Sequence, residues 1–283
     1  MTARMNREFI RKNNYAILGI MILGIFAIIA AGAGIFSPHL LNTGLYPFQP
    51  PSMTHPLGTN DMGYDILTEL FHASRVSMAI GVLAAWISVF IGGTLGILSG
   101  YFRGLIGEAL TGIIDIFLLI PVLPLMVVLA AYLGQHWWNI VLVISLLGWC
   151  STARAVRSKV LQLRETLFVE ALKALGISHR RIVVRHMVPH VFEILSAKFI
   201  LAVAGAMLSE AALAFIGLGD PSKTSWGMMM HYAFKRGGFV NGMWYWYLPP
   251  GLCIGVCTLG FILLGMHLEK KGTQTAGGED LVL

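Results

Sequence analysis

Two acidic residues, Asp115 and Glu210, lie inside apolar runs that are long enough to cross a lipid bilayer. A charged side chain is costly inside a membrane, so residues of this kind often bind ions, relay protons or line the path of a solute. A carboxylate can also serve a structural purpose, because it can accept a hydrogen bond from a neighbouring helix. Both roles follow from the residue types, and the sequence alone leaves them open.

Other patterns that carry chemistry do not occur in the sequence. The chain has no G-x-x-x-x-G-K-[ST] phosphate-binding loop, no H-E-x-x-H motif and no evident pair of nucleophile and base. Cys150, Cys253 and Cys257 lie in apolar segments without a nearby His or acid to complete a metal site. The run MMMH at 228–231 fits an apolar interfacial patch better than a site for a soft metal. We therefore predict no catalytic residue and no metal site.

The composition indicates a polytopic membrane protein. Of the 283 residues, 56% are hydrophobic and only 12% are charged, whereas soluble domains have about 25% charged residues. The formal net charge of +6 does not indicate nucleic-acid binding, because the basic residues cluster beside the apolar runs. Six runs have the length and apolarity of membrane spans, and the fold class that we predict is all-α. These runs cover approximately residues 15–36, 76–101, 109–133, 137–153, 191–218 and 248–268.

The distribution of Lys and Arg predicts how the chain is oriented. Basic residues are concentrated in 1–14, 154–190 and 269–283, which we expect to be the cytosolic N-terminus, a cytosolic loop and a cytosolic tail. Few lie in 37–75 and 219–247, which we expect to be extracytoplasmic loops. The first of these loops ends in a short amphipathic segment.

The cytosolic loop contains a polar insert with an unusual order of elements. Glu165 is expected to open a helix, Gly176 to follow its end, Ser178 to cap a second, basic helix, and Pro189 to close it. A basic amphipathic helix that lies on anionic lipid is the simpler interpretation of the composition. That interpretation does not explain the order of helix, glycine and helix.

The insert resembles the EAA loop of binding-protein-dependent ABC importer permeases. In that pattern, E-A-A is followed by three residues and Gly, and then by nine residues and I-x-L-P. Glu170, Ala171, Gly176 and Pro189 match at this spacing.

Three positions of the insert depart from the pattern. Leu172 replaces the second Ala, His186 the Ile, and Val188 the Leu. The helices and the glycine break are kept, so the resemblance implies that the insert docks on a cytosolic ATPase subunit. The residues that it assigns to this coupling are Glu170, Ala171, Gly176, Arg180, Arg181 and Pro189.

Three further motifs resemble one branch of the same family, the second or "C"-type permease of dipeptide, oligopeptide and nickel importers. HPLGTNDMGYD at 55–65 is similar to H-x-L-G-T-D-x-x-G-R-D, with Asn60 in place of the Asp and Tyr64 in place of the Arg. Any ion pair that those two residues make in relatives would be lost here. FIGLGDPSKTSWGMM at 215–229 and WYLPPGL at 246–252 also fit the branch.

The resemblance implies six transmembrane helices in a type I ABC importer permease-like (MetI-like) fold, in the inner, or cytoplasmic, cell membrane. The chain would form half of a pore with a second homologous permease, take short peptides or nickel and other metal chelates from an extracytoplasmic solute-binding protein, and contact two cytosolic ATPase subunits. ATP and Mg would be bound by those partners, with no cofactor in this chain and no nucleic acid as a partner.

The resemblance also implies roles for residues outside the insert. We expect His55, Asp65 and Trp226 to contribute to docking of the binding protein. Glu210 and Asp115 are candidates for the translocation path, although a structural pairing is favoured for Asp115. The alternative function is an ion-gradient-driven secondary transporter or channel, in which Asp115 and Glu210 would be ion sites.

Overall fold

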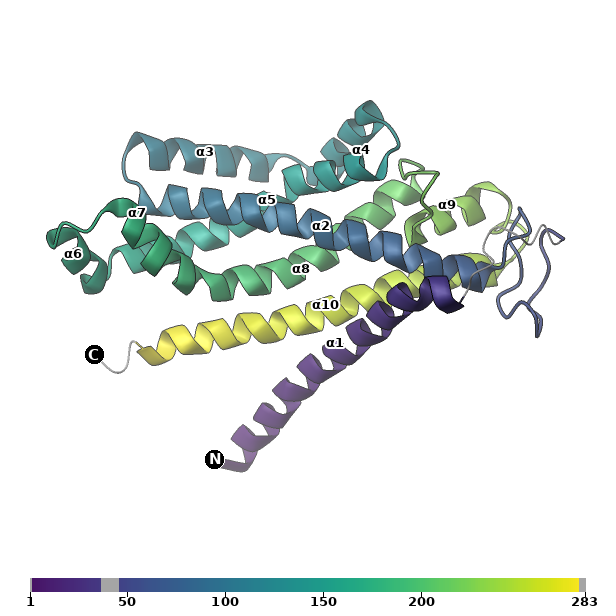
Figure 1. The fold of residues 1–283 in the computed structure, drawn as a ribbon, viewed down its shortest axis with the longest axis horizontal. Coiled ribbons are helices and arrows are strands. Elements are labelled where there is room, and N and C mark those ends of the chain that lie inside the picture. The colour runs from purple at the N-terminus through teal and green to yellow at the C-terminus, as the bar shows by residue number, and fades with distance from the viewer. Residues whose placement is uncertain (1, 37–45, 280–283) are drawn as a thin grey trace.

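The computed structural model describes residues 2–36 and 46–279, and these ranges are mainly helical. Long helices run beside one another along the longest axis of the molecule (Figure 1). Short helices α6 and α7 lie at one end, and α9 lies near the other. The start of α1 and the end of α10 both lie in the half of the molecule that carries α6 and α7.

Five helices within the described ranges are long and apolar enough to cross a membrane, and a bent helix pair would make a sixth span. The chain is thus an all-α polytopic membrane protein, as predicted. The five are α1 (Thr2–Phe36), α2 (Ile66–Tyr101), α5 (Trp137–Arg164), α8 (Val188–Phe215) and α10 (Trp244–Glu279), and the bent pair is α3 (Leu105–Leu119) with α4 (Val122–Leu133).

The third predicted span, 109–133, corresponds to the bent pair. Helices α3 and α4 meet at 89°. Ile120 between them is extended, with φ −75° and ψ 131°, because the ring of the following Pro121 disfavours helical backbone before it. The single span predicted here is therefore two helices joined by a sharp bend at the proline.

Two helices are longer than the predicted spans that they contain. Helix α2 begins at Ile66, so the amphipathic segment before span 76–101 belongs to the same helix. Helix α5 continues to Arg164, eleven residues beyond the predicted end at 153. Glu165 consequently follows a helix instead of opening one, and this corrects the expectation for that residue.

Pro189 also differs from its expected place. It lies in the first turn of α8, which continues the helical run that begins at His179, and it does not close a helix. The π-helical turn η1 (Val183–Met187) directly precedes it. Such a widened turn gives the proline ring room beside the preceding backbone carbonyls.

Glycines allow α2 and α5 to approach closely. A Cβ atom added at Gly92 would lie 2.5 Å from the carbonyl oxygen of Trp149, and one at Gly96 would lie 2.6 Å from that of Ala153. The backbones of the two helices touch at these points, so the small residues serve packing, as in other membrane helix pairs.

We expect Gly96→Leu to lower the thermal unfolding midpoint of the detergent-solubilised chain by several degrees. The added side chain collides with backbone that cannot move aside, and overpacking costs about 1–3 kcal/mol. Gly112→Leu in α3 is the matched control, because nothing lies within 4 Å of a Cβ built there. Equal midpoints for the two variants would show that the α2–α5 contact is not as tight as described.

Candidate functional site

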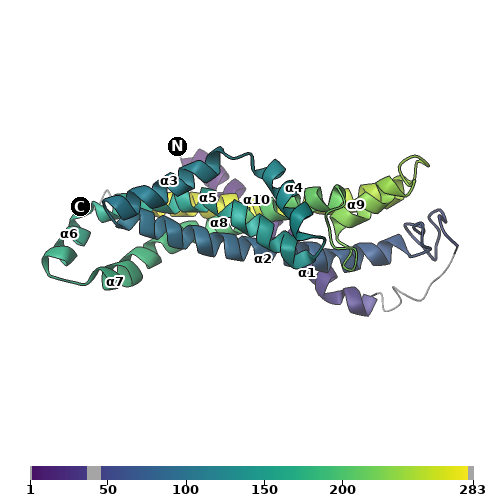
Figure 2. The ribbon, with the colours of Figure 1, turned by 90° about the horizontal axis from the view of Figure 1, so that it is seen from above.

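Pro189 lies in the first turn of α8, whereas the other five predicted coupling residues lie together at one end of the molecule. This α6–α7 tip (residues 165–187) consists of α6 (Leu167–Ala174), the turn after it, α7 (His179–Ile182) and η1, which leads into α8. It projects beyond the ends of the long helices (Figures 1 and 2).

Gly176 forms the turn between the two short helices. Its φ is +73°, a left-handed conformation that glycine adopts without strain. The N–H of Gly176 donates to the carbonyl of Lys173 (3.0 Å), and that of Ile177 donates to the carbonyl of Leu172 (3.1 Å). This pair of bonds is the Schellman motif that ends many helices, and it confirms the predicted position of Gly176 after a helix end. Ser178 precedes α7, but its side chain makes no capping bond.

The tip is attached to the ends of α2 and α5. Val169 and Ile182 are buried in one apolar cluster with Tyr101 of α2. The hydroxyl of Tyr101 lies 2.8 Å from Nδ1 of His179, and the ammonium of Lys173 lies 5.7 Å from the centre of the Tyr101 ring. A force on the tip would therefore reach the long helices directly.

The outer surface of the tip is mixed apolar and basic. Large apolar side chains are exposed on it, with Leu167 84%, Phe168 54% and Leu175 77% exposed. Exposed apolar groups gathered at one end of a molecule mark a contact surface. The six residues predicted to couple the chain to an ATPase are all exposed, and they are Glu170, Ala171, Gly176, Arg180, Arg181 and Pro189.

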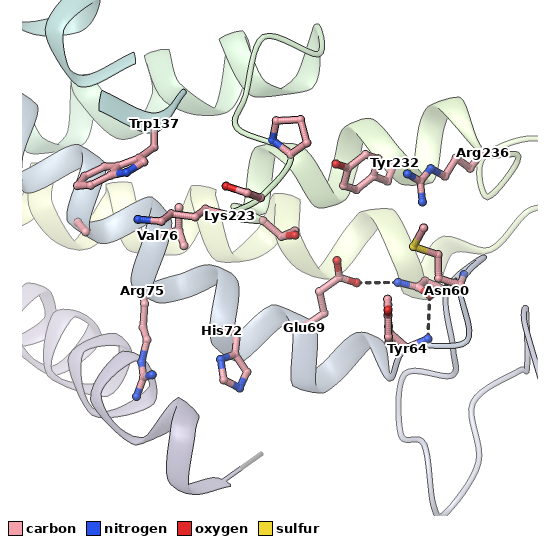
Figure 3. Close-up of a pocket in the computed structure, with 15 residues that line it drawn as sticks. Asn60, Tyr64, Glu69, His72, Arg75, Val76, Trp137, Lys223, Tyr232 and Arg236 are labelled. Atoms are coloured by element: carbon pink, nitrogen blue, oxygen red, sulfur yellow. Dashed lines mark hydrogen bonds between the residues drawn. The ribbon is translucent and has the colours of Figure 1, made fainter. Parts of the chain in front are cut away.

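The opposite end of the molecule contains a charged cavity of about 750 Å³. It lies among the first turns of α2, the start of α5, the loop 216–225 and α9 (Trp226–Lys235). Figure 3 shows Glu69 reaching into this space from α2 and Lys223 approaching from the loop before α9. Arg75 also borders the cavity, but its guanidinium turns away and donates to the carbonyls of Ala30 and Ala31 in α1.

Asn60 connects the loop 46–65 to this cavity. Its side-chain oxygen accepts hydrogen bonds from the N–H groups of Met62 and Tyr64, and its Nδ2 donates to Oε2 of Glu69 (3.0 Å). The amide that replaces the family's Asp thus has a specific partner. An ion pair is also present nearby, between Asp61 and Arg236 (2.8 Å).

We expect Asn60→Asp to destabilise the solubilised chain by about 1–3 kcal/mol, because it places two carboxylates at hydrogen-bond distance. The double variant Asn60→Asp/Glu69→Gln restores a donor and an acceptor in swapped positions, so it should recover most of the loss. Thermal unfolding of the single and double variants measures the coupling. If the double variant is no more stable than Asn60→Asp, the two side chains do not interact as described.

The cations of the cavity have different partners. The ammonium of Lys223 lies 4.2 Å from the centre of the Trp137 ring, and the guanidinium of Arg236 lies 4.2 Å from that of Tyr232. Burial acts to raise the pKa of the nearby Asp220. Hydrogen bonds from Ser222 and from the N–H of Trp137 outweigh burial and hold the pKa below its ordinary value, so Asp220 stays ionised.

The structure separates the three residues predicted to dock a binding protein. Nδ1 of His55 lies 3.1 Å from Asp65, which also caps α2 by accepting from the N–H of Thr68 (2.8 Å). These two side chains hold the loop 46–65 against α2. Trp226 is only 1% exposed, and its Nε1 donates to the carbonyl of Leu70. A buried indole cannot contact another protein, so Trp226 is a core residue here.

Glu210 lies in the interior between helices. It is 1% exposed and hydrogen-bonds Ser77 of α2 and Ser225 at the start of α9. The same two hydroxyls accept from the N–H groups of Trp226 and Met228. Glu210 therefore joins α2, α8 and α9, and its place on a translocation path stays a prediction.

Asp115 has the pairing that was favoured for it. Its carboxylate lies 2.8 Å from the guanidinium of Arg154, so the ion pair joins α3 to α5. Both side chains are more than half exposed in the single chain. Asp115 and Glu210 come from different parts of the bundle, and their partners do not bring them together.

The charged cavity could not be predicted from the sequence. Glu69 follows a helix cap, where an acid is common because it complements the helix dipole. Lys223 and Arg236 looked like ordinary loop charges. Only the approach of α9 to the start of α2 brings these residues together.

Comparison with known proteins gives consistent matches. Residues 92–271 match the family described as "Binding-protein-dependent transport system inner membrane component". The dipeptide transport system permease protein DppC of Alkalihalophilus pseudofirmus is 33% identical over 267 residues, which are 92% of this chain and 86% of that protein. The oligopeptide transport system permease protein OppC of Bacillus subtilis is 32% identical over 262 residues, 92% of this chain and 85% of that protein. OppC of Mycobacterium tuberculosis is 38% identical over 186 residues, 64% of each chain.

Proposed function

This chain belongs to the family of binding-protein-dependent transport system inner membrane components, and we propose that it is a permease subunit of an ATP-driven importer of short peptides. As a permease it is not an enzyme. Peptides are favoured over nickel or other metal chelates because the similar proteins named above are dipeptide and oligopeptide permeases. The gradient-driven alternative has less support, because Asp115 is paired with Arg154 and Glu210 with two serine hydroxyls, so both acids have structural partners.

The proposed assembly contains this chain and a second related permease, which together form the pore. Two cytosolic ATPase subunits bind ATP and Mg, and one of them docks on the α6–α7 tip. The chain lies in the cytoplasmic membrane with both termini in the cytosol. The placement of the start of α1 and the end of α10 in the half that holds the tip supports this orientation.

A solute-binding protein docks at the opposite, extracytoplasmic end. Large side chains are exposed there, including Met53, Phe239 and Val240. His55 and Asp65 shape this surface by holding the loop 46–65 against α2, whereas Trp226 supports it from the core.

The single observation that carries the coupling proposal is the structure of the α6–α7 tip. Its outer surface is exposed and partly apolar, while its inner surface is packed on the ends of α2 and α5. An ATPase that binds the outer surface can therefore change the tilt of the long helices. Alternating access needs such a contact to differ between the two states of the pore.

Co-purification of the tagged chain from mild detergent tests this proposal. We expect a second permease and two ATPase subunits to accompany it, with ATPase activity. Phe168→Asp together with Leu175→Asp should remove the ATPase subunits, since each substitution places a charge in an apolar contact. Val240→Asp, which is 87% exposed at the other end, is the matched control. A chain that purifies alone would contradict the proposal.

A further inference from the structure

We propose that the charged cavity receives a peptide during transport, with Glu69 binding its terminal ammonium and Lys223 binding its terminal carboxylate. The inference rests on the proposed function, because it assumes that the solute is a short peptide. It assigns to this chain a binding site of its own, in addition to any selection by the solute-binding protein.

Glu69 has an unused acceptor at the cavity. The residue is 9% exposed, and Asn60 donates to its Oε2. No described residue donates to its Oε1. A carboxylate removed from water needs more than one neutral donor to compensate for its lost hydration. The ammonium group of a ligand would supply the missing donors.

Lys223 is the complementary charge on the other wall. Its ammonium faces the ring of Trp137, and no carboxylate of the described residues forms an ion pair with it. Arg236 differs, because Asp61 already neutralises it. Arg75 differs as well, because its donors are used by α1. One carboxylate and one ammonium are thus available in the same cavity (Figure 3).

The rest of the cavity fits a small zwitterion with variable side chains. Its volume of about 750 Å³ falls within the range of about 300–1,000 Å³ that is usual for ligand sites. Part of the wall is apolar and can contact peptide side chains of differing size. It is formed by Met62, Val76 and Pro221. A metal ion is a poorer occupant, because the described residues contain no group of three His, Cys, Asp or Glu able to hold one.

Photo-crosslinking to the assembled complex tests the assignment. The complex of both permeases and the ATPase subunits is held in nanodiscs without the binding protein, so that only the membrane subunits select the ligand. The probe is alanyl-photoleucine, a dipeptide with a diazirine side chain, and it is compared with its N-acetyl and C-terminal amide derivatives. Mass spectrometry of the digested chain locates the label.

We expect label in residues 60–64 and 221–236. The N-acetyl derivative should label about tenfold less, as loss of one charged hydrogen bond predicts. Glu69→Gln should reduce labelling by the free dipeptide to a similar extent and remove its advantage over the N-acetyl form. Lys223→Met should also reduce labelling by the free dipeptide, and it should remove the advantage of the free dipeptide over the C-terminal amide. Glu108→Gln, an exposed acid in α3, should change nothing.

Label outside the cavity, or equal labelling by the free and blocked dipeptides, would overturn the inference. If Glu69→Gln fails to assemble, the blocked dipeptides on the unaltered complex and the Lys223→Met variant decide the question. Uptake of the dipeptide into proteoliposomes with the binding protein distinguishes failure of this inference from failure of the proposed function. Uptake without label in the cavity would contradict only this inference. An assembled complex that imports no dipeptide would contradict the proposed function.

Discussion

Replacing Gly176 by proline is expected to lower ATP-driven transport by about tenfold or more while the chain remains in the membrane. Proline fixes φ near −65°, whereas Gly176 has φ +73°, and proline also lacks the N–H that donates to Lys173. The turn must therefore change shape, and α7 must move relative to α6. Gly176 is exposed, and nothing lies within 4 Å of a Cβ at this position, so the substitution acts through the backbone of the turn. The defect should thus be confined to the tip.

The measurements are peptide uptake, ATPase activity and the amount of inserted chain. Gly176→Asn is the informative companion, because asparagine tolerates left-handed backbone and should keep most of the transport. The exposure of the tip also predicts that Glu170→Lys with Arg181→Glu, two reversals of exposed charges, impairs transport without loss of insertion. Normal uptake by the proline variant would show that the shape of the turn does not matter for coupling.

Replacing Glu210 by alanine is expected to lower the free energy of unfolding of the chain by roughly 3 kcal/mol. The hydroxyls of Ser77 and Ser225 lose their shared acceptor, and a buried space is left where three helices meet. The thermal unfolding midpoint of the solubilised chain should fall by several degrees. Yield of the inserted chain should fall with it.

Glu210→Gln separates a structural role from a role in the solute path. The amide keeps the size of the side chain and one acceptor, so most of the stability should return. If Glu210 served only the path, the alanine variant would unfold at the unaltered temperature and lose transport. An unchanged midpoint would therefore contradict the role of Glu210 as a junction of α2, α8 and α9.

Much of the fold follows from the sequence, because membrane length and apolarity determine where helices lie. The position of Gly176 could also be predicted, since a left-handed turn after a helix strongly favours glycine. The end of α5 could not be predicted, because Arg154 and Arg157 end the apolar run while the backbone stays helical to Arg164. A polar surface on a helix that leaves the membrane does not end that helix.

The candidate sites differ in how far the sequence could reveal them. The tip is contiguous in the chain, so its pattern of glycine and exposed charges is visible locally. The charged cavity joins residues more than 150 positions apart, Glu69 with Lys223. Trp226 was misplaced for a related reason. The resemblance placed it in an extracytoplasmic loop as a docking residue, and only the packing of α9 against α2 shows that its side chain is buried.

The most direct test of the central claim is the energy source of transport. The complete complex and its binding protein are placed in proteoliposomes, and uptake of a labelled dipeptide is measured with ATP or ADP, with and without a proton or sodium gradient. The proposed function predicts that uptake requires ATP and does not respond to either gradient. Uptake driven by a gradient with ADP alone would contradict it and return attention to Asp115 and Glu210 as ion sites.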